Sequence, residues 1–107
     1  MTALSHRWIN SIMKNSYFLQ TIYENTRSLG LVTSQYGFGR LCGRKDSWFS
    51  SCKSTDRPMT IAAMITLAMN IERLPADRIP KSKRKQVKEL TKTLWLLVES
   101  KATLPME

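Results

Sequence analysis

The residues best suited to specific chemistry lie between positions 35 and 52, and their chemistry is hydrogen bonding rather than catalysis. Gly39 is a small residue where two helices would cross closely, and Gly43 stands where the chain would reverse between them. Apolar side chains recur at i/i+3 and i/i+4 spacing on both sides of that turn, at Phe38, Cys42, Phe49 and Cys52. The pattern indicates two short helices joined by a tight glycine turn, which is typical of a helix-turn-helix that reads DNA.

The chain carries no arrangement of residues typical of catalysis. It has no paired acids in a cleft motif, no nucleophile with a neighbouring histidine and no phosphate-binding loop. We therefore expect no enzymatic activity and no cofactor. Cys42, Cys52 and the distant His6 do not supply the four ligands of a zinc site, so we expect no metal. We predict that both cysteines are buried in the core in a reducing cytoplasm, and a redox pair is the alternative.

Composition favours one small domain with a polyanionic partner. The 107 residues suit a single domain, and 42% of them are hydrophobic, which is enough for a small core. The formal net charge is +9, from 17 Lys and Arg against 8 Asp and Glu, and nucleic acid is the expected partner for such an excess. No apolar run approaches the roughly 20 residues of a membrane span. Polar residues interrupt the first helix, so no signal region is expected and the chain should be cytoplasmic.

The elements that would position these residues are all helices. The apolar periodicity predicts helices at residues 4–15, 17–29, 45–53, 60–72 and 81–101, and one from a cap at Thr33 or Ser34 to about residue 42. We expect an all-α fold, a compact bundle of five to six helices that contains the helix-turn-helix, with an added N-terminal helix and a long C-terminal helix. The predicted organisation is an N-terminal helical extension at 1–15, a helix-turn-helix DNA-binding domain at 16–74, and a linker with the C-terminal helix at 75–107.

The predicted C-terminal helix has two different faces. Lysines at positions 81, 85, 88 and 92 fall within about 60° of one another, either as a solvated face or as an extension that follows a nucleic-acid backbone. The segment 94–98 is apolar all round, more than one stripe of a surface helix requires. We expect either a second copy of the chain or the N-terminal helix of the same chain to cover it. The candidate dimer interface consists of Leu90, Leu94, Trp95 and Leu97.

The stretch from residue 29 to residue 71 resembles the phage-repressor type (XRE-like) of helix-turn-helix domain, found in small bacterial and phage regulators. Ser34-Gln35 resembles the opening of that family's second helix, and Gly39 and Gly43 stand at its small-residue and turn positions. Phe49 and Cys52 stand at its two core positions in the recognition helix. The segment 57–68, with Arg-Pro followed by Thr-Ile-Ala-Ala-Met-Ile-Thr-Leu-Ala, is similar to its fourth helix. Arg44, Gly37 and Pro58 depart from the pattern and place the chain among divergent members.

The resemblance implies which side chains would contact DNA. The recognition helix, at about 45–53, would lie in the major groove and present to base edges Lys45, Asp46, Ser47, Ser50 and Ser51. Phosphates would be bound by Gln35, Arg40, Arg44, Lys53 and Arg57. Asp46 has three possible roles, a base contact, a clamp on Arg44 or Lys45, or the helix N-cap, and we favour the N-cap. For Trp48 we favour packing at the edge of the core over a DNA contact.

These features lead to one main hypothesis and two alternatives. We expect a sequence-specific DNA-binding transcriptional regulator that is a homodimer and a repressor. We expect it to be cytoplasmic and nucleoid-associated, and encoded by a bacterium, phage or plasmid. One alternative is a protein-interaction module, such as an antitoxin or a regulator-binding adaptor, that uses the apolar terminal helices. The other is non-specific nucleic-acid binding, because serine-rich recognition residues form few bidentate contacts with bases.

Overall fold

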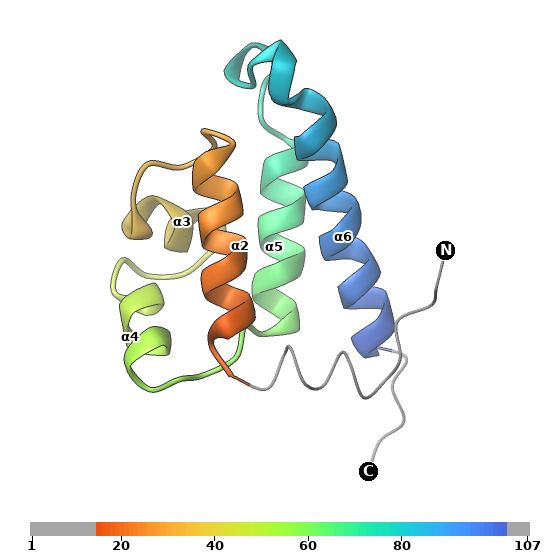
Figure 1. The fold of residues 1–107 in the computed structure, drawn as a ribbon. Coiled ribbons are helices and arrows are strands. Elements are labelled where there is room, and N and C mark those ends of the chain that lie inside the picture. The colour runs from red at the N-terminus through yellow and green to blue at the C-terminus, as the bar shows by residue number, and fades with distance from the viewer. Residues whose placement is uncertain (1–14, 103–107) are drawn as a thin grey trace.

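The fold is entirely helical over the part of the chain that the structure describes. A computed structural model describes residues 15–102 (Figure 1), and the predicted helix at 4–15 lies largely outside them. The α-helices are α2 (Tyr17–Ser28), α3 (Gln35–Leu41), α4 (Trp48–Ser54), α5 (Ile61–Glu72) and α6 (Arg84–Ala102). Two single 3₁₀ turns, η1 (Ala76–Arg78) and η2 (Lys81–Lys83), connect α5 to α6. The predicted all-α bundle with a long C-terminal helix is confirmed.

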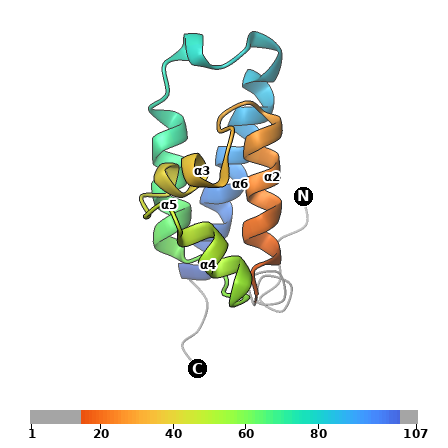
Figure 2. The same cartoon turned by 90° about the vertical axis from the view of Figure 1, so that its left-hand side faces the viewer.

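The axes of the three longer helices run roughly parallel to one another, and the two short helices lie on one side of them. In Figure 1, α3 and α4 lie to the left of α2 and α5, and α6 lies to the right. The view turned by 90° places α3 and α4 in front and α6 behind (Figure 2). The α5 helix packs most extensively against α6 and also contacts α3. It therefore connects the C-terminal helix to the pair of short helices.

One hydrophobic core holds all five helices together. Its buried members include Leu19 of α2, Phe38 of α3, Phe49 of α4, Leu67 of α5 and Leu94 of α6. Because α6 contributes to the same core, the boundary predicted at residue 74 does not separate two packed units. Burial of these side chains is the main stabilising contribution, about 25 cal/mol for each Å² of apolar surface removed from water.

The leucines assigned to a dimer interface are buried inside the protomer instead. Leu90, Leu94 and Leu97 are 7%, 0% and 2% exposed, and Trp95 is half-buried against the same core. The indole Nε1 of Trp95 donates a hydrogen bond to Glu72 Oε2 at 3.3 Å. The apolar residues of α6 thus contribute to the core of one chain, in which α6 packs most extensively against α5. The N-terminal helix that was the other expected partner lies largely outside the described residues.

Three helices end in the same hydrogen-bonded turn, the Schellman motif. After α2, the amide of Leu31 donates to Thr26 O and that of Gly30 donates to Arg27 O, and Gly30 has φ +77°. The same pair of bonds follows α3, where Gly43 has φ +74°, and α4, where Asp56 has φ +53°. Glycine adopts such angles without steric cost. In aspartate the left-handed conformation has a steric cost, which other interactions must offset.

That compensation comes from the start of α2. Asp56 Oδ1 accepts hydrogen bonds from the Ser16 amide at 3.2 Å and from Ser16 Oγ at 2.8 Å. These bonds lower the pKa of Asp56 below its ordinary value of 3.8. Asp56 therefore joins the loop after α4 to the first turn of α2.

None of the described helices is long and apolar enough to span a membrane.

Candidate nucleic-acid interface

Two glycines determine how α3 and α4 meet. A Cβ atom at Gly39 would lie 3.3 Å from the carbonyl oxygen of Lys45, so the small residue allows the chain after the turn to approach α3. At Gly43 a Cβ would lie 2.9 Å from Thr66 Cγ2 of α5, in addition to the positive φ. Asn70 Nδ2 donates to Leu41 O at 2.8 Å and holds the end of α3 on α5. The predicted roles of both glycines are confirmed, and α5 serves as the platform for the turn.

The second short helix begins later than predicted. It starts at Trp48, and residues 45–47 form the preceding turn, closed by the bond from the Trp48 amide to Lys45 O at 3.0 Å. Ser47 occupies the N-cap position, although its side chain makes no capping bond. The preference for Asp46 as N-cap is therefore wrong. Lys45, Asp46 and Ser47 belong to the turn, which is positioned by Gly39 and not by helical hydrogen bonds.

The inner face of α4 is fixed by aromatic packing. Phe49 and Cys52 are buried, and the Phe49 ring meets Phe38 edge-on with centroids 5.7 Å apart. Trp48 is half-buried and stacks on Phe38 at 6.4 Å, which confirms packing at the edge of the core. Tyr23 of α2 also packs against Phe49 at 4.8 Å. With one face fixed in this way, the opposite face of α4 is presented to solvent in a defined orientation.

Asp46 forms an ion pair with Arg40 of α3, a partner that the sequence analysis did not consider. Arg40 Nε donates to Oδ1 at 2.8 Å and Nη2 donates to Oδ2 at 3.1 Å. The hydrogen bond from Arg40 lowers the pKa of Asp46, and both side chains are largely exposed. A bidentate pair holds the turn against α3 and partly neutralises two side chains that were assigned to DNA.

Two further arginines on this side of the molecule bind hydroxyl groups of the protein. Arg57 Nη2 donates to Ser51 Oγ at 2.8 Å and its Nε donates to Thr55 Oγ1 at 2.9 Å. Arg44 Nη2 donates to Thr60 Oγ1 at 3.3 Å. The hydroxyl of half-buried Ser51 is thus engaged, whereas both arginines keep exposed N–H groups.

The remaining polar side chains of the turn and of α4 are accessible. Lys45, Ser47, Ser50 and Lys53 are exposed, and the ammonium group of neither lysine forms a hydrogen bond or ion pair within the described residues. We call these four residues the α4 polar face. The Ser50 hydroxyl donates to Ser47 O at 3.2 Å and retains its acceptor capacity. Gln35 is half-buried at the start of α3, close in sequence to this face.

Tyr36 is a candidate contact that the sequence analysis missed. Its side chain is 60% exposed, and it lines an open hollow together with Lys45, Asp46 and Ser47. An exposed aromatic ring beside a basic turn can pack on a sugar or a base. The sequence contained a signal for this exposure. Tyr36 lies in the first turn of the predicted helix, two residues after Ser34, and it is out of phase with the inward-facing Phe38.

The lysine stripe of the C-terminal helix does not share this surface. Lys81, Lys85, Lys88 and Lys92 are exposed, and α6 lies on the far side of α2 and α5 from α3 and α4 in both views (Figures 1 and 2). The stripe is a separate basic surface, not an extension of the α4 polar face.

The two cysteines are free and buried, as predicted for core residues. Cys42 is 1% exposed and Cys52 is 3% exposed, and neither forms a disulfide. Burial raises the pKa of the Cys42 thiol to about 12. A thiol held neutral in this way is a poor nucleophile, so it contributes packing and not chemistry.

The fold and this surface define a small, basic, all-helical protein in which a pair of short helices displays a polar face. The chain belongs to a family of unknown function, DUF6626, whose model matches residues 19–104. The match includes α3, α4, α5, α6 and all but the first two residues of α2, in agreement with their shared core. Neither the curated proteins nor the solved structures give a match.

Proposed function

We propose that this protein is a sequence-specific DNA-binding regulator of transcription that places α4 in the major groove. The observation that carries the proposal is the α4 polar face. Phe49 and Cys52 fix the back of the helix, so Ser47 and Ser50 point outward between two cations, Lys45 and Lys53. A helix presented in this way has the size and polarity that the major groove accepts.

The proposed contacts differ from those expected of the sequence alone. Lys45, Ser47 and Ser50 would contact base edges, and Lys53 would bind a phosphate. Arg40 and Asp46 bind each other, so their proposed role is to hold the turn in place. Arg57 would keep one phosphate contact through its free N–H groups while it orients Ser51. Gln35 and Arg44 remain proposed phosphate ligands.

The length of α4 supports binding as a pair of protomers. Seven residues extend for about 10 Å, which corresponds to roughly three base pairs. A site of that size is too short to be specific, and two half-sites one helical turn apart are the usual solution. We therefore propose a homodimer on DNA, through a surface other than the buried leucines of α6.

Fluorescence anisotropy with a labelled duplex selected from a random library tests the proposal. Each matched variant removes one positive charge: Lys45→Ala and Lys53→Ala on the α4 polar face, and Lys85→Ala and Lys92→Ala on α6. The first two should weaken binding, and Lys53→Ala should lower the slope of log K against log salt by about 0.9. The α6 variants should bind as the native protein does, apart from a small effect of net charge.

Two other results would point away from the proposal. Equal affinity for selected and random duplexes would indicate non-specific binding, which is the weaker alternative. Absence of duplex binding at low salt, with one protein that co-purifies, would favour the interaction module. The interaction module was inferred in part from the apolar end of α6, and this argument is weakened because Leu94, Leu97 and Val98 are buried in the core.

A further inference from the structure

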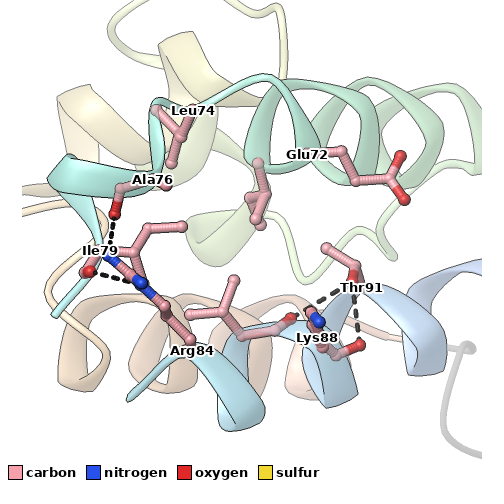
Figure 3. A pocket seen from close by; sticks show the side chains of 9 residues that line it. Glu72, Leu74, Ala76, Ile79, Arg84, Lys88 and Thr91 are labelled. Carbon is pink, nitrogen blue, oxygen red and sulfur yellow. Dashed lines mark hydrogen bonds between the residues drawn. The ribbon is translucent and has the colours of Figure 1, made fainter. Parts of the chain in front are cut away.

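A pocket lies between the end of α5, the turn η1 and the first half of α6, on a different part of the surface from the α4 polar face (Figure 3). Its volume is about 350 Å³, within the range of small-molecule sites. The apolar wall consists of Ile71, Leu74, Ile79 and Val87. Within the part of the chain that the structure describes, no aromatic side chain lines it, so these residues offer no surface on which a nucleobase would stack.

The polar side chains around this pocket leave cations without an anionic partner. Arg84 Nε donates to Ile79 O at 3.2 Å and Nη2 donates to Ala76 O at 2.9 Å, so the guanidinium is held in position, and no carboxylate of the described residues pairs with it (Figure 3). The Lys88 ammonium is exposed and forms no hydrogen bond or ion pair within the described residues. The Thr91 hydroxyl is satisfied by backbone, since it donates to Lys88 O at 2.9 Å.

The one acid of the lining does not neutralise these cations. Glu72 Oε2 accepts the hydrogen bond of Trp95 Nε1 at 3.3 Å, and in Figure 3 the Glu72 carboxylate points away from Arg84. The connection between α5 and α6 adds Arg78 and Lys81 against Asp77 nearby in the chain, whereas Lys83 Nζ donates to Ser28 O at 2.7 Å. The local potential therefore favours an anion beside an aliphatic wall.

We propose that this pocket binds a small carboxylic acid with an unbranched aliphatic chain. The chain would lie against Ile71, Leu74 and Val87, and the carboxylate would bind Lys88 and the outer N–H groups of Arg84. At about 30 Å³ for each water-sized group, the volume holds roughly a dozen non-hydrogen atoms, which suits a medium-chain acid. The assignment is independent of DNA binding and is tested without DNA.

Heteronuclear NMR titrations of the full chain with octanoate, octanol and octylammonium test the proposal. Octanoate should bind saturably and shift the amides of residues 72–91, octanol should bind more weakly, and octylammonium should not bind. Butanoate, with the same carboxylate and a shorter chain, should bind more weakly than octanoate. Octanol binding as tightly as octanoate, or absence of saturable octanoate binding, would overturn the proposal.

Three variants locate the site. Lys88→Gln should weaken octanoate binding about fivefold, the size expected for loss of one exposed charge-assisted hydrogen bond. Lys92→Gln removes the same charge one turn further along α6, outside the pocket, and should leave binding unchanged. Ala76→Leu, at an exposed lining residue, should fill part of the cavity and abolish binding. Equal binding by the native protein, Lys88→Gln and Ala76→Leu would exclude this pocket.

Discussion

Gly43 and Gly30 provide a matched pair that tests how the turn between α3 and α4 is built. Both follow a helix in the same Schellman motif, with φ of +74° and +77°. A Cβ atom at Gly30 would meet nothing within 4 Å, whereas at Gly43 it would lie 2.9 Å from Thr66 Cγ2. Alanine at either position carries the cost of a left-handed conformation, about 1–2 kcal/mol. Only Gly43→Ala adds a steric conflict with α5.

The size of that conflict follows from how Thr66 is held. Thr66 Oγ1 donates to Ala62 O at 2.9 Å, and rotating the methyl group away would break this bond. The loss of such a hydrogen bond costs about 1 kcal/mol. We therefore expect Gly30→Ala to lower the free energy of unfolding by about 1–2 kcal/mol and Gly43→Ala by about 2–3 kcal/mol.

Urea unfolding followed by circular dichroism measures both changes, and Thr66→Ser supplies the control. Serine keeps the hydroxyl and lacks Cγ2, so in this background Gly43→Ala should cost no more than Gly30→Ala. Gly37→Ala, within α3, is a second control. The added Cβ would meet only ordinary contacts, with Ser34 at 3.5 Å and Val32 at 3.9 Å. It should stabilise the protein by about 0.5–1 kcal/mol. If Gly43→Ala costs no more than Gly30→Ala in the native background, the account of the turn is wrong.

Two pH-dependent predictions follow from the buried thiol and from the link between α4 and α2. The raised pKa of Cys42 means that its contribution to stability is complete below the ordinary value of 9.0 and is lost as pH rises toward about 12. The difference in stability between the native protein and Cys42→Ala should therefore shrink over that range in urea unfolding, and a constant difference would contradict the assignment. The lowered pKa of Asp56 has the opposite sign, so its contribution is present above 3.8 and is lost as pH falls. The native protein should lose more stability than Asp56→Asn between neutral pH and pH 3, and parallel losses would show that the bonds to Ser16 do not depend on charge.

The features predicted correctly from the sequence depend on local or periodic signals. Gly43 was assigned to the turn between two helices, and glycine is strongly preferred at the left-handed position of such a turn. Phe38 and Phe49 were assigned to the core because apolar spacing reports the inward face of a helix. Each of these inferences requires only a few consecutive residues.

The features that were missed depend on how distant segments meet. Arg40 reaches Asp46 only because the turn folds back onto α3, and Ser16 reaches Asp56 across 40 positions. Neither contact has a sequence period. Asp56 is the clearest example of a feature that sequence patterns do not reveal. Its left-handed conformation is not marked by a glycine, and it depends on hydrogen bonds from Ser16, 40 positions earlier in the chain.

The apolar end of α6 is an instructive error of a different kind. The segment 94–98 is apolar all round, more than one stripe requires, and a second copy of the chain was one explanation. The structure buries Leu94, Leu97 and Val98 in the same core as the residues of α5, and Trp95 packs at the edge of that core. A wide apolar face therefore indicated burial without identifying the partner.

The proposed DNA interface is tested most directly by mapping a duplex onto the protein by NMR. With ¹⁵N-labelled protein and a selected duplex, the largest amide shifts should fall on residues 36 and 45–54, in the turn and α4. The amides of residues 81–92, in η2 and the first half of α6, should change little, because α6 lies on the opposite side of the bundle. Shifts confined to residues 81–92, or no shifts at low salt, would contradict the proposal that α4 enters the major groove.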